Sequence, residues 1–414
     1  MPEFLSLLPP SEALAKLASH LSLSPAPEEV PTNQALGRVT FSSILAPHPM
    51  PSFTRSTVDG YALRAADTYG ASESLPAYLE LAGEVAMGQE AGFSLTPARC
   101  AVIHTGGMLP PGADAVVMIE YTQTVRPSDV EILRSVAIGE NVLKVGEDVA
   151  GGQEVIPVGT RLRPAEIGGL MALGILQVQV AKKPRVGILS SGDEVVPPEE
   201  EIRPGQVRDI NSYTLSALVE QAGGVATRFG IVPDNAADLR EAALGALPEC
   251  ELLVITAGSS ASARDLTAEV IDSLGEPGVL VHGVEVRPGK PTILAACNLD
   301  GQDKAVIGLP GNPVSALVIA RLFIIPIINR LLGLRESLVQ PQVRARLSLN
   351  LPSQAGREDW IPVRIASEEG GYVAEPVFGK SNLIFTLARA DGLVRIPPAA
   401  TGLSAGEEVD VLLF

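Results

Sequence analysis

The chain has 414 residues, of which 46% are hydrophobic, 19% charged and only 4% aromatic, and its formal net charge is −17. This length exceeds one ordinary hydrophobic core and this composition excludes extensive disorder, so we expect about two to four folded domains. The acidic balance argues against nucleic acid or an anionic membrane as a partner. The three cysteines are widely spaced, which favours neither a zinc site nor a disulfide framework.

The N-terminus has no basic leader, and the longest apolar segment, residues 313–328, contains Arg321 and Pro326. We therefore expect a cytoplasmic protein without a signal peptide and without a membrane span.

The first third of the chain combines helical and extended patterns. Apolar spacing predicts a short helix at 11–22 with Ser11 as its N-cap, and a second helical piece at 33–38. From 53 to 144 the pattern changes to short β-type runs broken by Gly and Pro, which is typical of a small all-β domain. The strands that we expect there are 78–85, 100–104, 115–119 and 130–133. A helix from Pro164 to Leu173 then returns to the earlier pattern, so the β domain is interpreted as an insertion.

From residue 182 the chain alternates strands and helices, which predicts a three-layer α/β domain with a mostly parallel sheet. The expected strands are 185–189, 225–232, 252–255, the pair flanking 287–291, and 305–307. The expected helices are 211–222 capped by Asn211, 236–247, 267–274, and a last one that Asn312 caps and Pro313 begins. After residue 334, five short β runs at 343–349, 360–364, 372–376, 393–396 and 408–413 predict a small C-terminal barrel or sandwich.

Polar and glycine residues follow the strands of the α/β region. Because the carboxyl ends of parallel strands meet at one edge of a sheet, we expect these residues to converge on one pocket. Backbone N–H groups, two cations and several carboxylates fit a phosphate ester bound with a divalent metal. The residues proposed to contact it are Ser190, Ser191, Gly192, Gly258, Ser259, Ser260, Arg287, Lys290, Pro310, Gly311, Asn312 and Pro313.

The carboxylates available to this pocket are Asp193, Glu194, Asp234 and Asp265. Mg²⁺ takes one or two protein carboxylates and completes its shell with water and phosphate oxygens. For each residue the alternative interpretation is a helix cap or a surface charge.

Three motifs outside this region are weaker indications of a functional site. Asp59 precedes Gly60 in a turn pattern, Thr105 precedes a glycine pair that could surround a polar ligand, and Asp148 reads as a loop cap or a site carboxylate. The segment 379–382, Gly-Lys-Ser-Asn, resembles part of a P-loop but lacks the upstream glycine, so we expect no nucleoside triphosphate site there.

Six motifs in order resemble the MoeA and gephyrin C-terminal family. They are STVDGYALR (56–64), HTGGMLPPGADAVVMIE (104–120), GENVLKVGED (139–148), SSGDE (190–194), RPGKP (287–291) and GLPGNPVSA (308–316). The resemblance implies a molybdopterin molybdenumtransferase, which uses Mg²⁺, takes adenylated molybdopterin and molybdate as substrates, and releases AMP. It also implies an elongated homodimer and contacts with other proteins of the same pathway.

The resemblance further implies which residues act. Asp59, Thr105 and Asp148 would come from the β domain of one subunit, and Glu194, Asp234 and Asp265 from the α/β domain of the other, with Glu194 and Asp265 as metal ligands. Arg287, Lys290, Pro310 and Pro313 would join the α/β side. Two loops depart from the family pattern, namely 256–265, which ends in Arg-Asp as in MoaB, and 142–145, which lacks the usual basic run.

The domains that follow from these patterns are a discontinuous helical and extended linker domain (1–52 and 145–181), an inserted β domain (53–144), a MoaB/Mog-like molybdopterin-binding α/β domain (182–333) and a C-terminal β-barrel domain (334–414). Other functions that fit the resemblance are a molybdopterin adenylyltransferase, a gephyrin-like scaffold, and a diverged paralogue that binds cofactor without catalysis.

Overall fold

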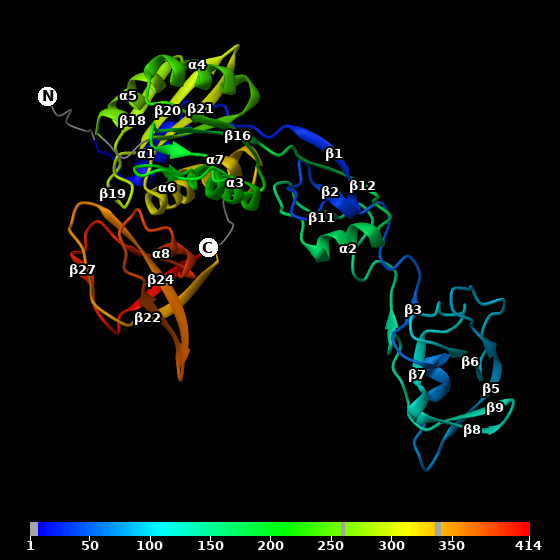
Figure 1. The fold of residues 1–414 in the computed structure, drawn as a ribbon. Helices are drawn as coiled ribbons and strands as arrows, with labels where there is room; N and C mark the ends of the chain where they lie inside the picture. The colour runs from blue at the N-terminus through cyan, green and yellow to red at the C-terminus, as the bar shows by residue number, and fades with distance from the viewer. Residues whose placement is uncertain (1–6, 258–260, 336–340) are drawn as a thin grey trace. The chain divides into compact units, whose positions relative to one another are not determined.

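In this computed structural model we describe residues 7–257, 261–335 and 341–414, and only the backbone of 261–264. The chain divides into two compact units (Figure 1). One comprises Met1–Ser42, Val158–Arg163 and Gln177–Phe414, and the other Ser43–Pro157 and Pro164–Leu176. We call them the α/β unit and the β unit. The division of the chain into four domains at the predicted boundaries remains a prediction.

A six-stranded sheet is the centre of the α/β unit. Its order is β16 (Val225–Val232), β13 (Arg185–Ser191), β17 (Leu252–Ala257), β21 (Gln302–Pro310), β20 (Ile293–Leu299) and β18 (Pro277–His282). The first four strands are parallel, and β20 and β18 are antiparallel to their neighbours. All six residues of β17 are buried, as expected for a parallel strand covered on both faces.

Helices cover both faces of this sheet (Figure 1), which confirms the predicted three-layer domain. Leu252 and Val254 of β17 belong to the core that contains α3 (Asn211–Ala222), whereas Leu253 and Ile255 belong to the core that contains α4 (Ala236–Ala246) and α5 (Ala261–Asp272). Alternate residues of a strand point to opposite faces, so one apolar run serves two cores.

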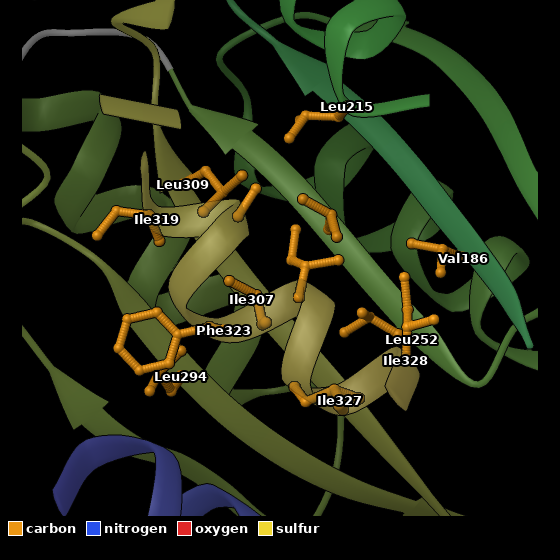
Figure 2. Packing of buried hydrophobic residues seen from close by; sticks show 14 of the residues in the cluster. Val186, Leu215, Leu252, Leu294, Ile307, Leu309, Ile319, Phe323, Ile327 and Ile328 are labelled. Atoms are coloured by element: carbon orange, nitrogen blue, oxygen red, sulfur yellow. The ribbon is translucent and has the colours of Figure 1, made fainter. Parts of the chain in front are cut away.

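The segment Pro313–Leu331 packs on the α3 face. It consists of α6 (Pro313–Ile319), a π-helical turn (Ala320–Ile324) and α7 (Ile325–Leu331). Its mean hydropathy of 1.9 would allow a membrane span by length and composition alone, but 61% of it is buried inside the protein. Figure 2 shows Ile319, Phe323 and Ile327 of this segment in the core. Pro326 does not end the helical segment, because it lies in the first turn of α7.

The C-terminal strands form a closed barrel, which confirms that expectation. Each strand pairs with the next in the order β24 (Glu358–Glu368), β25 (Gly371–Pro376), β22 (Gln342–Leu347), β28 (Glu408–Leu413) and β26 (Gly392–Ile396), and β26 pairs again with β24. The short strand β19 (Val286–Arg287) from the α/β region pairs in parallel with β24. Smaller elements here are β23 (Leu351–Pro352), β27 (Gly402–Leu403) and α8 (Phe385–Ala388).

Near the N-terminus the structure corrects two predictions. The helix α1 (Pro10–Ala18) begins at Pro10 after Pro9, and Ser11 is not its N-cap, because proline already provides the dihedral angle of a first turn. The expected helix at 33–38 is only the 3₁₀ turn Thr32–Gln34, and Gly37 has a positive φ that a helix does not allow. The strand β1 (Pro27–Pro31) pairs with β12 (Gln177–Ala181).

The β unit contains a second six-stranded sheet. Its order is β7 (Ala115–Met118), β4 (Gly60–Leu63), β6 (Arg99–Ile103), β5 (Ala77–Glu84), β9 (Asp129–Ile132) and β8 (Thr122–Arg126). Two smaller ladders join β3 (Arg55–Ser56) to β10 (Val142–Leu143) and β2 (Ile44–Leu45) to β11 (Glu154–Ile156). The helix α2 (Pro164–Ala172) begins at Pro164 as predicted. The sequence patterns did not indicate β4, which directly follows a turn, or the exposed edge strand β8.

Candidate functional site

The carboxyl ends of four parallel strands lie side by side. Ser190 of β13 is opposite Thr256 of β17, which is in turn opposite Leu309 of β21, and Ser191 is opposite Val232 of β16. The residues after these strands are therefore near one another, although they are far apart in the sequence.

Ser190 is buried, and its hydroxyl group is engaged in a network. It accepts a hydrogen bond from Thr256 Oγ1 at 3.3 Å and donates one to Asp209 Oδ2 at 2.9 Å. The other oxygen of Asp209 accepts from the Ser212 amide at 3.1 Å, at the start of α3. The predicted cap Asn211 is instead the first helical residue and makes no cap hydrogen bond. Ser190 thus supports Asp209 and α3, which differs from the predicted contact with a ligand.

Ser191 holds a second carboxylate. Its hydroxyl donates to Asp234 Oδ1 at 2.7 Å, and the Asp234 amide donates to Asp193 Oδ1 at 3.1 Å. Gly192 follows with φ of +150°, where a Cβ would lie 2.9 Å from Glu194 Oε2. Glycine is favoured here because L residues rarely adopt this φ, and because a Cβ would also lie 2.7 Å from Val195 Cγ2.

A cavity of about 500 Å³ opens beside this loop. We call it the Tyr213 cavity; its lining includes Gly192, Asp193, Asp209, Ser212, Tyr213 and Arg228. The Arg228 guanidinium lies 4.1 Å from the centre of the Tyr213 ring. Partial burial and the neighbouring Glu199 carboxylate raise the pKa of Tyr213. The cavity offers a flat, cation-supported aromatic wall to a ligand.

A larger cleft of about 1120 Å³ lies between the α/β region and the barrel. We call it the basic cleft; four cations line it, Arg287 and Lys290 from the segment before β20, and Arg357 and Lys380 from the barrel. Its lining also includes Glu285, Asp359, Ser381, Pro310 and Asn312. The Val314 amide donates to the Ser381 carbonyl at 3.0 Å, which fixes the barrel against the start of α6.

The loop 308–313 borders this cleft. Pro313 begins α6 as predicted, and Asn312 occupies the N-cap position, but its side chain makes no cap hydrogen bond. The side-chain Nδ2 of Asn211 donates to the Gly311 carbonyl at 2.8 Å. The side-chain oxygen Oδ1 of Asn211 is buried without a hydrogen-bond partner in the described chain. Asn211 therefore joins the α3 start, which lines the Tyr213 cavity, to the loop that lines the basic cleft.

The predicted residues do not line a single pocket. Lys290 and Pro310 line the basic cleft, whereas Glu194 and Asp265 line neither of the two hollows described here. Asp265 is exposed on α5. Gly258, Ser259 and Ser260, which we predicted to contact a ligand, lie outside the described residues.

The carboxylates can be tested for a metal site. Within the residues whose side chains are described, no group of three or more His, Cys, Asp and Glu could hold a metal ion. Mg²⁺ needs only one or two protein carboxylates when it keeps water and phosphate oxygens. Asp234 uses Oδ1 for Ser191, which leaves Oδ2 as an oxygen donor, and Glu194 is half-buried after the end of β13.

Two of the three predicted residues in the β unit are in contact. The Thr105 amide donates to Asp59 Oδ1 at 2.9 Å, and both side chains are exposed. His104 Nδ1 lies 3.7 Å from the same oxygen, and its Nε2 lies 2.9 Å from Glu84 Oε1. Asp148 is exposed in a loop. Its backbone amide donates to the Met50 carbonyl, and its carboxylate caps no described backbone group.

Sequence reasoning missed the contribution of the barrel. Lys380 and Ser381 belong to the Gly-Lys-Ser-Asn segment that we set aside as an incomplete P-loop, and the structure places them in the basic cleft. Nothing in the pattern around Arg357 indicated a site. Asp209 could have been found from its place just before the predicted helix, where a carboxylate often caps, whereas Asn211 was predicted only as a helix cap.

Comparison with known proteins covers nearly the whole chain. Family models match the MoeA N-terminal region (domains I and II) at residues 8–174, a probable molybdopterin-binding domain at 187–330 and the MoeA C-terminal region (domain IV) at 344–414. A molybdopterin molybdenumtransferase of Nostoc is 34% identical over 91% of this chain and 86% of its own, and one of Bacillus subtilis is 32% identical over 98% and 94%.

Solved structures agree with this result. A molybdopterin biosynthesis MoeA protein of Pyrococcus horikoshii OT3 has a TM-score of 0.86 at 32% identity, covering 99% of this chain and 100% of that one. A second MoeA structure from Pyrococcus horikoshii has a TM-score of 0.81 at 38% identity and covers 99% of both chains.

Proposed function

Because this chain belongs to the MoeA family, we propose that it acts in molybdenum cofactor biosynthesis by inserting molybdate into adenylated molybdopterin, with release of AMP. The basic cleft is the observation that supports this most directly. Four cations and two carboxylates, Glu285 and Asp359, line it, which leaves an excess of positive charge there in a chain whose formal net charge is −17. A local positive field of this kind is needed to gather an oxyanion and a phosphate against the overall charge.

The two hollows suit different parts of the substrate. The Tyr213 cavity has an aromatic wall and a volume within the usual range for small-ligand pockets, about 300–1,000 Å³, so it fits a nucleoside. The basic cleft fits phosphate and molybdate. The Asn211–Gly311 hydrogen bond lies between the residues of the two hollows, and we propose that the phosphoanhydride of the substrate crosses there.

The carboxylates at the strand ends would serve the hydrolysis. Water adds to one phosphorus of the phosphoanhydride, the bridging oxygen leaves with the other phosphate, and a proton is released. Asp234 is held by Ser191, so it can accept that proton or orient the water from a fixed position. Mg²⁺, when bound by Glu194 and Asp265 or by Asp234, would neutralise phosphate charge.

The family resemblance supports further parts of the proposal. They are the dependence on Mg²⁺, the adenylated form of the substrate, the homodimer, the cytoplasmic location, and the roles of Asp59, Thr105 and Asp148. In the β unit, the contact between Asp59 and the Thr105 amide supports a common role for these two residues.

The experiment supplies purified protein with adenylated molybdopterin, Mg²⁺ and molybdate, and AMP is measured over time. We expect AMP release by the wild type and a strong loss in Glu194→Gln and in Asp265→Asn. Unchanged turnover in both variants would remove these two residues from the site. Consumption of ATP with unmodified molybdopterin would instead identify an adenylyltransferase.

A further inference from the structure

Asp359 is a nearly inaccessible carboxylate at the basic cleft. It is 1% exposed, and its Oδ1 accepts a hydrogen bond from Arg357 Nε at 2.9 Å. Its Oδ2 is buried without a hydrogen-bond partner among the described residues and lies 3.8 Å from a terminal nitrogen of Arg287. A buried carboxylate is costly unless it is paired and hydrogen-bonded, so a half-satisfied one needs an explanation.

The two arginines that contact Asp359 come from two neighbouring segments that line the cleft. Arg357 precedes β24 of the barrel, and Arg287 ends β19, where the ladder between β19 and β24 places it opposite Asp359. Arg357 is bound through Nε, which leaves its two terminal nitrogens for another acceptor. Both side chains remain accessible, at 29% for Arg357 and 64% for Arg287. The buried acid therefore holds Arg357 through Nε and leaves both of its terminal nitrogens free of the acid, and it lies beside one of the two terminal nitrogens of Arg287.

The neighbouring Glu358 provides a comparison within the same strand. It is also buried, and it binds Arg395 through Oε1 and Trp360 Nε1 through Oε2. Neither Glu358 nor Arg395 lines the basic cleft. Both oxygens of Glu358 are satisfied, one by Arg395 and the other by Trp360, which lines the cleft, and Glu358 contacts none of the four cations of the cleft in the described chain.

We propose that Asp359 is a positioning residue of the basic cleft, which orients Arg357 and Arg287 so that a tetrahedral oxyanion is bound between them. The inference rests on the proposed function, because molybdate is the oxyanion that this function requires. A planar guanidinium binds an oxyanion well only when its parallel N–H groups point at the anion. Asp359 would hold the two guanidinium groups in that orientation.

The variant Asp359→Asn distinguishes positioning from simple electrostatics. Removal of a negative charge near an anion site should strengthen anion binding if only Coulomb attraction matters. If Asp359 aims the two arginines, the same change should weaken molybdate binding, by roughly tenfold for the loss of a charge-assisted hydrogen bond. The two explanations therefore predict opposite changes in the molybdate affinity of Asp359→Asn.

The measurement is calorimetric titration of the full-length protein with molybdate, together with the dependence of AMP release on molybdate concentration. We expect Asp359→Asn to raise the molybdate Kd and KM and to leave kcat at saturating molybdate nearly unchanged. Glu358→Gln is the matched control; it should lower the thermal midpoint but leave the molybdate Kd unchanged. Arg357→Lys keeps the positive charge but removes the paired N–H donors of the guanidinium group, and we expect it to weaken molybdate binding as Asp359→Asn does.

Each outcome decides the inference. Tighter or unchanged binding in Asp359→Asn, equal weakening in Asp359→Asn and Glu358→Gln, or no molybdate binding by the wild type would overturn it. If Asp359→Asn fails to fold, Arg357→Lys at the partly exposed position decides in the same way. Molybdate binding that follows the expected pattern without any AMP release would support the positioning role and count against the proposed function.

Discussion

Ser190 and Ser191 are adjacent and buried, yet their hydroxyl groups serve two different carboxylates. Successive residues of a strand point to opposite sides, so one serine supports Asp209 at the start of α3 and the other supports Asp234 at the end of β16. Small hydroxyl residues at a strand end thus fix the position of acids, in addition to any contact with a ligand.

Removal of the Asp209 carboxylate should destabilise the fold. Asp209→Ala leaves the buried Ser190 hydroxyl and the Ser212 amide without their acceptor, so we expect the free energy of unfolding to fall by about 1–3 kcal/mol. Urea denaturation measures this loss. Glu200→Ala, at an exposed position, should change stability by less than about 0.5 kcal/mol, and an equal loss in both variants would contradict the network.

The three cysteines should be unreactive in the folded protein. Burial raises the pKa of the Cys100 thiol to about 12 and that of Cys250 to about 11, and burial also raises the pKa of Cys297. At pH 8 all three stay protonated, and a thiol reagent should label them only after denaturant is added. Rapid labelling of the native protein would contradict this.

The raised pKa values of the cysteines also determine how the stability of the fold depends on pH in the alkaline range. Each folded-state pKa lies above the ordinary value of 9.0, so the associated stability is complete below about pH 9 and is lost as the pH rises towards about 11 for Cys250 and about 12 for Cys100. Cys250→Ser and Cys100→Ser should each flatten the decline of stability above pH 9, which alkaline unfolding curves would show.

At the scale of elements, the segment 287–291 approaches α6 very closely. Gly289 has φ of +117°, and a Cβ there would lie 2.4 Å from Ile319 Cγ1. The segment presents Arg287 and Lys290 to the basic cleft, so this close contact determines where two of the four cations lie.

A single methyl group at Gly289 should therefore disturb both stability and the cleft. We expect Gly289→Ala to lower the free energy of unfolding by about 2–4 kcal/mol, because a positive φ and a steric overlap add together. Gly301→Ala is the control. It also has a positive φ but meets no atom within 4 Å, so its cost should be about 1 kcal/mol. Denaturant unfolding compares the two, and equal costs would show that the contact with Ile319 is unimportant.

The same elements show what the sequence could predict. The short apolar runs 252–255 and 305–307, each followed closely by a glycine, favoured buried strands, so the alternation of strands and helices and the sheet edge were predictable. The basic cleft was not, because it depends on pairing between β19 and β24, which no local pattern encodes. The strand β4 was missed because it spans only Gly60–Leu63 after a turn. The hydrogen bonds of Ser190 to Thr256 and Asp209 were not predictable, because they join segments far apart in the sequence, and its contact with a ligand stays a prediction.

At the scale of the whole molecule, the proposed catalytic residues belong to different units. Asp59 and Thr105 lie in the β unit, whereas Glu194 and Asp234 lie in the α/β unit. The family resemblance implies a homodimer in which one reaction uses the β residues of one subunit and the α/β residues of the other. This assembly is a proposal that activity measurements can test.

Two inactive variants should restore activity to each other when their subunits are mixed. Asp59→Asn inactivates through the β residues and Glu194→Gln through the α/β residues, so a mixed dimer contains one site in which both sets are intact. Random re-association after mild dissociation makes about half of the dimers mixed, and AMP release should return to about a quarter of the wild-type rate.

The matched control mixes Asp234→Asn with Glu194→Gln, two changes in the same unit. Every site in such a mixed dimer retains a defect, whichever subunit supplies the β residues, so no activity should return. Recovery in the first mixture alone supports the shared site. Recovery in neither mixture, with subunit exchange verified by mass spectrometry, would show that each subunit uses its own residues, whereas wild-type activity of Asp59→Asn by itself would show that Asp59 takes no part.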